Sequence, residues 1–190
     1  NKLEGHKMAK IVIAEDEAII RMDLVEILEE AGHDVVGQTG RGDEAMELVE
    51  SNNPDLVILD VRMPGMNGIE VAKKVNETSN AAILILTSYS QQELMTQARE
   101  VGASAYIVKP VQKDDFINSV NVALVRKSVS TFVDSVDEDE KSSVKRKIDE
   151  AICVIVDNEN VNEFEAWQKL GSSGNENVIS NADKTLADNA

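Results

Sequence analysis

The sequence predicts an α/β fold, in which a five-stranded, parallel, doubly wound sheet is followed by a C-terminal all-α helical domain. Residues 10–127 alternate between short apolar runs and longer amphipathic stretches, which is the order of a parallel sheet with helices on both faces. The apolar runs are nearly continuous, as is typical of strands that are buried on both faces. After about residue 127 no strand-like run follows, so the rest of the chain is expected to be helical.

Each predicted strand is a short apolar run, and the stretch after it has apolar residues at helical spacing. The strands are expected at Lys10–Ala14, Asp34–Gly37, Asp55–Asp60, Ala81–Thr87 and Ala105–Val108. The helices after them are expected at Glu17–Ala31, Asp43–Glu50, Gly68–Glu77, the segment marked by Leu94, Ala98 and Val101, and Asp114–Arg126. Gly32 is expected to end the first helix.

The pattern divides the chain into three segments. Residues 8–127 form the α/β domain, residues 128–140 a helical and acidic linker, and residues 141–190 a small helical domain. The linker ends in the acidic run Asp137–Glu140, whose charge suits the positive end of the next helix. Helical patterns then follow at Lys141–Val156, Glu163–Leu170 and Ala182–Ala187, with a break at Gly171–Gly174.

Composition excludes several classes of protein. The 190 residues carry 19 basic and 35 acidic side chains, a net charge of −16, which argues against a strongly basic, non-specific nucleic-acid binder. Cys153 is the single cysteine, so the disulfide-stapled secreted class is excluded. No apolar run approaches the ~20 residues of a membrane span, and no signal peptide is visible before Met8, a candidate natural start. A cytoplasmic protein without a membrane partner is expected.

Polar side chains stand at the ends of four predicted strands. With the strand order 2-1-3-4-5, these strand ends are neighbours at one edge of the sheet, where ligands bind in folds of this class. The groups that would converge there are Glu15 and Asp16, Asp60, Thr87 and Ser88, and Lys109. Each has an ordinary explanation by itself, because carboxylates and hydroxyls cap helices and a lysine is often a surface residue. Together, at the ends of these strands, they predict a functional pocket.

The chemistry of the predicted pocket is that of phosphoryl transfer. Three crowded carboxylates repel one another unless a cation lies between them, and an all-oxygen ligand set favours Mg²⁺. Asp60 can act as a carboxylate nucleophile that forms an acyl phosphate. Lys109 would neutralise one phosphoryl oxygen, and the Thr87 hydroxyl would donate a hydrogen bond to another.

Four motifs in order resemble the receiver domain of two-component response regulators, which has a CheY-like (flavodoxin-like) fold. They are Glu15-Asp16, Leu-Asp-Val-Arg-Met-Pro-Gly-Met-Asn-Gly (59–68), Leu-Thr-Ser (86–88) and Ala-Tyr-Ile-Val-Lys-Pro (105–110). The resemblance covers residues 8–127 and implies that Asp60 accepts a phosphoryl group from a sensor histidine kinase. It implies that the protein is no enzyme beyond self-phosphorylation and autodephosphorylation.

The same resemblance assigns roles to the residues around Asp60. Mg²⁺ would bind Glu15, Asp16, Asp60 and the backbone carbonyl of Arg62. Tyr106 and Thr87 would form the conformational switch, and Lys109-Pro110 would be a cis peptide. Glu15 stands where the family more often has Asp.

The C-terminal segment resembles an ANTAR domain, the small three-helix RNA-binding module of AmiR- and NasR-type antitermination regulators. The residues that carry this resemblance are Arg146–Ala151 and Asn160–Leu170. It implies binding of RNA hairpin loops and control of transcription antitermination, with homodimer formation through the linker helix on phosphorylation. The candidate RNA-contacting residues are Lys145, Arg146, Lys147 and Trp167.

A second interpretation of the tail stays open, in which it serves dimerisation or partner docking and does not bind RNA. The usual Ala-Lys-Gly of the ANTAR family stands here as Ala151-Ile152-Cys153. Residues 128–190 carry 6 basic against 14 acidic side chains, a net charge of −8 that disfavours contact with phosphates. The basic cluster is equally well a solvated helix face, and Trp167 has the helical spacing of a core residue.

Overall fold

The computed structural model describes residues 8–88, 96, 100–159, 161, 166–167, 169–170 and 175–189. The chain divides into two compact units, Asn1–Leu124 and Val125–Ala190. Within the described residues, no helix is both long and apolar enough to cross a membrane.

The first unit is a five-stranded parallel sheet in the order β2-β1-β3-β4-β5, as the sequence predicts. The strands are β1 (Lys10–Ala14), β2 (Asp34–Thr39), β3 (Leu56–Asp60), β4 (Ala82–Thr87) and β5 (Ala105–Val108). The helices are α1 (Ala18–Glu30), α2 (Gly42–Asn52), α3 (Gly68–Thr78) and the start of α5 (Lys113–Asp134). The helix predicted between β4 and β5 lies largely outside the described residues.

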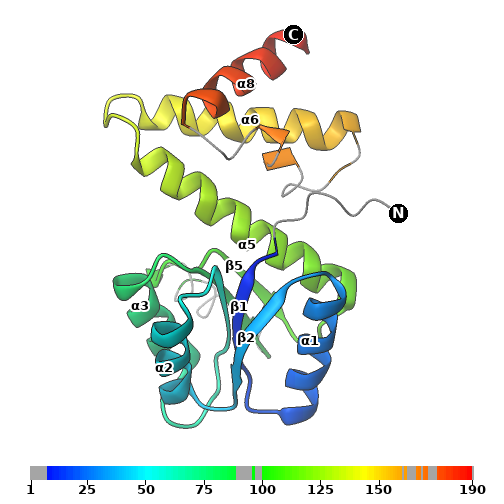
Figure 1. Cartoon of the computed structure of the whole chain (residues 1–190), viewed down its shortest axis with the longest axis vertical. Coiled ribbons are helices and arrows are strands. Elements are labelled where there is room, and N and C mark those ends of the chain that lie inside the picture. Colours follow the sequence, from blue (N-terminus) through cyan, green and yellow to red (C-terminus); the bar gives the residue numbers. More distant parts are fainter. Residues whose placement is uncertain are drawn as a thin grey trace. The chain divides into compact units, whose positions relative to one another are not determined.

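Helices cover the sheet on two faces (Figure 1). Successive strand residues point to opposite faces, so β1 sends Val12 and Ala14 to one side and its remaining apolar residues to the other. The first side packs against α2 and α3 through Val49 and Val75. On the opposite face lie α1 and α5, which an ion pair between Glu30 and Lys113 joins. Because both faces are covered, β3 and β4 are buried throughout, which explains their continuous apolar runs.

The loop after β3 is held by close backbone contacts that only glycine allows. A Cβ on Gly68 would lie 2.0 Å from the carbonyl oxygen of Asp60, and a Cβ on Gly42 would lie 1.8 Å from that of Met66. The N–H of Gly68 donates to the Val61 carbonyl at 3.0 Å, and that of Gly42 to the Pro64 carbonyl at 3.1 Å. The chain beyond Asp60 is therefore fixed against two neighbouring elements.

The last helix of the α/β unit is longer than predicted. The expected helix Asp114–Arg126 and the helical part of the linker are one continuous helix, α5, which ends at Asp134. No glycine or proline interrupts residues 113–134, so nothing breaks the helix at the expected boundary of residue 127. The division between the two compact units lies within this helix, between Leu124 and Val125.

The second unit is helical, as predicted, and is built on α6 (Lys141–Glu159) and α8 (Asn175–Asp188). The apolar stripe of α6 is buried and consists of Val144, Ile148, Ala151, Ile152 and Ile155. The weak pattern predicted at Ala182–Ala187 belongs to the longer helix α8. Only part of the segment predicted at Glu163–Leu170 is described, and the break at Gly171–Gly174 lies outside the described residues.

Candidate functional site

The strand register brings the predicted functional residues to one edge of the sheet. Ala14 pairs with Leu59, so Glu15 and Asp60 follow at the same level. Asp60 pairs with Leu86 of β4, and Thr87 pairs with Val108 of β5. Lys109 follows Val108 directly, and its N–H donates to the Thr87 carbonyl at 2.7 Å. Four strand ends therefore meet within about one residue of a common level.

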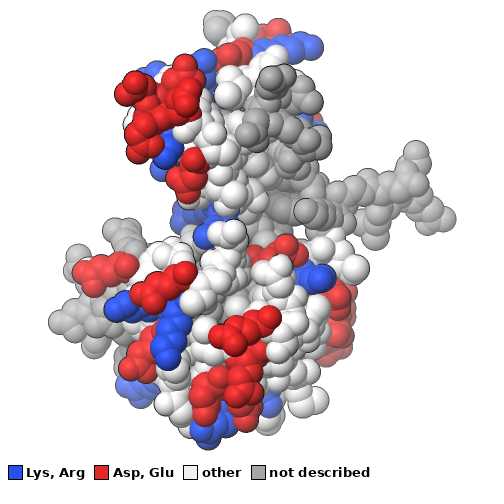
Figure 2. Space-filling view, turned by 60° about the vertical axis from the view of Figure 1, so that its left-hand side comes forward, with Lys and Arg blue, Asp and Glu red and all other residues white. Residues whose placement is uncertain are grey.

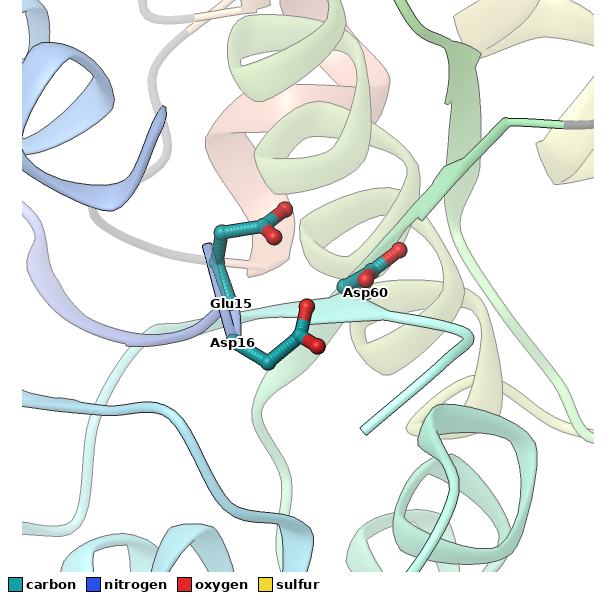
Figure 3. Close-up of side chains that lie close together, drawn as sticks. All are labelled: Glu15, Asp16 and Asp60. Atoms are coloured by element: carbon teal, nitrogen blue, oxygen red, sulfur yellow. The ribbon is translucent and has the colours of Figure 1, made fainter. Parts of the chain in front are cut away.

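Three carboxylates converge at this edge (Figure 3). One carboxylate oxygen from each of Glu15, Asp16 and Asp60 lies within 4.8 Å of the other two. Glu15 is fully buried and Asp60 is 4% exposed, whereas Asp16 is exposed to solvent. Carboxylates at this separation repel one another, and they form an all-oxygen set of the kind that hard divalent cations bind.

Lys109 supplies the positive charge that these carboxylates need. Its Nζ lies 2.6 Å from Oε2 of Glu15, 3.3 Å from Oδ1 of Asp60 and 3.8 Å from Oε1 of Glu17. The Lys109 side chain is itself only 9% exposed, so these ion pairs are largely shielded from solvent. The peptide between Lys109 and Pro110 is cis, as the motif implied.

Burial and charge shift the pKa values of this pair. Burial, followed by the negative charge of Glu15, raises the pKa of Asp60 to about 6, while Lys109 opposes the shift. Burial alone would lower the pKa of Lys109, but the hydrogen bond to Glu15 and the charge of Asp60 outweigh it and raise that pKa. At neutral pH the two groups therefore face each other as carboxylate and ammonium.

The Glu15 side chain already has a partner for each of its oxygens. Oε1 accepts a hydrogen bond from the N–H of Glu17 at 3.0 Å, which caps the entry to α1. Oε2 forms the ion pair with Lys109. A glutamate reaches back to both partners because its side chain is one methylene longer than that of the aspartate the family usually has. Asp16 and Asp60 are thus the carboxylates that are best placed to face a cation.

Arg62 lies beside the same carboxylates. A cavity of about 550 Å³ opens next to the cluster, and Asp16 and Arg62 line it together with Asn67 and Glu70. Asn67 and Glu70 form a capping box at the start of α3, in which the Asn67 side chain accepts from the Glu70 N–H at 2.9 Å. The cavity leaves room for a phosphoryl donor to approach the three carboxylates.

The predicted switch residues lie on adjacent strands. Thr87 is buried at the end of β4, next to the residue that pairs with Asp60. Tyr106 stands on β5, pairs with Ile85, and is 37% exposed. The two residues therefore belong to the β4–β5 side of the site, with the tyrosine turned toward solvent.

The structure separates the four candidate RNA-contacting residues. Lys145 and Arg146 are exposed on α6, whereas Nζ of Lys147 pairs with Asp183 of α8 at 2.8 Å. Trp167 is 5% exposed, and its ring meets that of Phe132 edge-on at 6.3 Å and 67°. The assignment of Trp167 as an RNA contact is therefore corrected: its ring fills the core and presents no face to a base.

Acidic side chains gather over the turn between α5 and α6, on the face drawn in Figure 2. The sequence places the run Asp137–Glu140 there, and Lys141 pairs with Glu138. The exposed basic residues of α6 thus stand next to an acidic neighbourhood, which limits how strongly they attract phosphates.

Two residues that contact the site escaped the sequence analysis. Glu17 lies within reach of Lys109, and Arg21 donates through Nη1 to the backbone carbonyl of Glu15. Arg21 carries a signal in the sequence, because it stands three and seven residues before the buried Leu24 and Leu28. A charged residue on the inner stripe of a helix needs a polar partner inside the fold.

Comparison with known proteins agrees with this geometry. A family profile for the response regulator receiver domain matches residues 11–121. The transcriptional regulatory protein PdtaR of Mycobacterium tuberculosis is 48% identical over 117 residues, which are 62% of this chain and 57% of PdtaR. The chemotaxis protein CheY of Thermotoga maritima is 35% identical over 113 residues, 59% of this chain and 94% of that protein. The chain therefore spans little more than half the length of PdtaR.

Solved structures of similar proteins share the α/β fold. The chemotaxis protein CheY4 of Vibrio cholerae has a TM-score of 0.58 at 30% identity, over 62% of this chain and 99% of that one. A DNA-binding response regulator of the LuxR family from Staphylococcus aureus has a TM-score of 0.59 at 28% identity, again over 62% and 99%. Neither match extends over the whole chain, so the helical tail needs arguments of its own.

Proposed function

This chain belongs to the response regulator receiver family, and on that basis we propose that Asp60 accepts a phosphoryl group from a sensor histidine kinase. The observation that carries the proposal is the buried contact of Lys109 with Glu15 and Asp60, 2.6 Å and 3.3 Å away, at the carboxyl ends of the strands. A carboxylate that only caps a helix needs no buried ammonium beside it. The protein acts as a phosphoacceptor whose own chemistry is limited to self-phosphorylation and autodephosphorylation.

The transfer needs little covalent work from the protein. A carboxylate oxygen of Asp60 attacks phosphorus as the N–P bond of a phosphohistidine breaks, and the imidazole keeps the electron pair of that bond. Lys109 stands where it neutralises charge on the phosphoryl oxygens, and Thr87 supplies a hydroxyl donor from the neighbouring strand. The pKa of Asp60, about 6, leaves most of the carboxylate ionised at neutral pH.

Mg²⁺ is the cation that fits this donor set. Asp16, Asp60 and the backbone carbonyl of Arg62 would hold it, with Glu15 adding negative charge close by. When bound, Mg²⁺ screens the phosphoryl oxygens from the carboxylates. The buried pair of Glu15 and Lys109 leaves Asp16 as the exposed carboxylate that a hydrated ion meets first.

For the tail, RNA binding remains the first candidate function, with transcription antitermination as its output. The observation that favours it is the exposed pair Lys145 and Arg146 on α6, for which no ion pair is found within the described residues. PdtaR is a transcriptional regulatory protein, which supports an output at the level of transcription. Phosphorylation would shift the Thr87–Tyr106 side of the receiver and favour a homodimer through the helix that continues into the tail.

Dimerisation or partner docking without RNA is the second candidate function. It is favoured by the net charge of −8 over residues 128–190 and by the ion pair that occupies Lys147. The two candidates differ in one measurable property, because phosphate contacts make RNA binding strongly dependent on salt while an apolar interface is much less so.

Phosphate-affinity electrophoresis after incubation with acetyl phosphate tests the phosphoacceptor role. The wild-type protein is expected to show a retarded, acid-labile band that forms with Mg²⁺ and not with EDTA. Asp60→Asn should abolish that band, while Asp34→Asn, an exposed aspartate at the start of β2, should leave it unchanged. A retarded band of normal intensity in Asp60→Asn would show that another residue is the acceptor.

A further inference from the structure

Arg21 connects three elements beneath the carboxylate cluster. It stands on α1, and its Nη1 donates to the backbone carbonyl of Glu15. The guanidinium lies against the turn after β2, where a Cβ on Gly40 would be 3.2 Å from Nη1. The same Cβ would be 3.5 Å from the Cα of Asp16 and 3.7 Å from the carbonyl oxygen of Glu15. One cation therefore fills the space between α1, the loop after β1 and the turn after β2.

The side chain of Arg21 is held inside the fold at a cost. Its Nε is buried and forms no hydrogen bond within the described residues, although an arginine remains charged at any relevant pH. An unsatisfied buried donor is unfavourable by itself. Its presence here indicates that the contact made by Nη1 offsets this cost in the folded protein.

The contact made by Nη1 controls a peptide that matters for cation binding. The carbonyl of Glu15 belongs to the peptide unit that joins Glu15 to Asp16, so its direction sets where the Asp16 side chain points. On one side of this peptide, the N–H of Glu15 donates to the Thr39 carbonyl at 3.0 Å. On the other side, the N–H of Glu17 donates to Oε1 of Glu15. The bond from Arg21 completes this set at the carbonyl itself.

We propose that Arg21 is a positioning residue for divalent-cation binding, which acts by holding the Glu15–Asp16 peptide so that the Asp16 carboxylate faces Asp60. Arg21 belongs to none of the receiver motifs in the sequence, and its effect passes through backbone geometry. The inference rests on the proposed function only in so far as the carboxylate cluster binds a cation. Gly40 is part of the same device, because the absence of a side chain there leaves room for the guanidinium.

The test is the Mg²⁺ affinity of the unphosphorylated protein, measured by isothermal titration calorimetry. Arg21→Gln is expected to weaken Mg²⁺ binding about tenfold, in line with the loss of other residues that orient metal ligands. Arg21→Lys, which keeps the charge but has a single donor head, should recover part of the affinity. Lys73→Gln, which removes an exposed positive charge from α3 of the same unit, should bind like the wild type.

Gly40→Ala supplies a second route that leaves Arg21 in place. An added Cβ should displace the guanidinium by a few tenths of an ångström and weaken Mg²⁺ binding about two- to threefold. In the double variant the two effects should not multiply, because both act through the same contact. This variant also keeps the inference testable if Arg21→Gln fails to fold, which circular dichroism would reveal.

The outcomes separate this inference from the proposed function. If the wild type binds Mg²⁺ and is phosphorylated while folded Arg21→Gln and Gly40→Ala bind Mg²⁺ equally well, the role of Arg21 is refuted and the phosphoacceptor role stands. If the wild type neither binds Mg²⁺ nor accepts a phosphoryl group, the proposed function fails first. Phosphorylation of Arg21→Gln that recovers at saturating Mg²⁺ would identify the defect as one of cation binding.

Discussion

The ammonium of Lys109 lies 2.6 Å from the carboxylate of Glu15, so these two residues form a buried ion pair at the ends of β5 and β1. Asp60 shares the same ammonium at 3.3 Å, which leaves two buried carboxylates with one counter-charge between them. This imbalance of charge is what a divalent cation would relieve. It also makes the stability of the protein respond in a definite way to mutation, pH and Mg²⁺.

Asp60→Asn should stabilise the protein in the absence of Mg²⁺. The pKa of Asp60 is raised from about 3.9 in the unfolded chain to about 6, so ionisation of the folded protein above pH 6 is unfavourable. Removing that charge should raise the free energy of unfolding at pH 7.5 by about 1–3 kcal/mol. Thermal denaturation with EDTA measures the difference.

The pH dependence of this gain has a fixed sign. A carboxyl with a raised pKa makes the folded state bind its proton more readily than the unfolded state does, so its penalty disappears as the pH falls from 6 toward 4. The wild type and Asp60→Asn should therefore converge in melting temperature below about pH 5. A difference that grows as the pH falls would contradict the raised pKa.

Lys109→Gln should destabilise the protein and prevent phosphorylation. The substitution leaves Glu15 and Asp60 buried without a counter-charge, which costs about 3–5 kcal/mol when one partner of a buried pair is removed. The double variant Lys109→Gln/Glu15→Gln should regain much of that stability and remain unphosphorylated. Denaturant unfolding and phosphate-affinity electrophoresis measure the two properties; phosphorylation of the double variant at the wild-type rate would exclude a role for Lys109 in transfer.

Mg²⁺ should stabilise the folded protein through the carboxylate cluster. A ligand that binds only the folded state at ten times its Kd adds about 1.4 kcal/mol to the free energy of unfolding. Asp16→Asn removes the exposed carboxylate of the cluster and should weaken the shift in melting temperature. NaCl at matched ionic strength is the control, and an equal shift with NaCl would mean that the effect is only screening.

Gly68→Ala should cost far more stability than Gly32→Ala. An added Cβ at Gly68 would lie 2.0 Å from the carbonyl oxygen of Asp60, so the strand end must move, at a cost on the order of 3 kcal/mol. At Gly32 the Cβ meets no atom within 4 Å, and only the positive φ of 85° opposes alanine, at about 1 kcal/mol. Urea unfolding gives both values; similar losses would show that the loop after β3 yields easily.

Charge reversal at Lys145 and Arg146 tests the RNA-binding candidate. The double variant Lys145→Glu/Arg146→Glu should abolish salt-dependent binding to paired hairpin loops in a gel-shift titration with acetyl-phosphate-treated protein. Both residues are exposed, so the melting temperature should stay close to that of the wild type. If the wild type itself binds no RNA with or without acetyl phosphate, docking or dimerisation is the function of the tail.

Trp167→Phe is the matched control for that experiment. It keeps an aromatic ring in the core against Phe132, so RNA binding should persist. A folded Trp167→Phe variant that has lost RNA binding would restore the tryptophan as an RNA contact and overturn the correction made from its burial.

The sequence predicted the sheet well because its signals are local. Continuous apolar runs marked the strands, and β1 and β5 have the predicted bounds, while the other strands differ by one or two residues at an end. The end of α5 was missed because the end of a helix needs a breaker, and residues 113–134 contain neither glycine nor proline. The role of Trp167 was open in the sequence because the same helical spacing serves a core residue and a surface residue.

By itself, the sequence determined the order of strands and helices and which polar residues end the strands, because both are set by neighbours along the chain. Tertiary structure decided what those residues touch. It directed both oxygens of Glu15 to partners other than a cation, placed Lys109 between Glu15 and Asp60, and brought Arg21 under the Glu15 carbonyl. These contacts join residues on different elements, and their distances and their burial exist only once the sheet has formed.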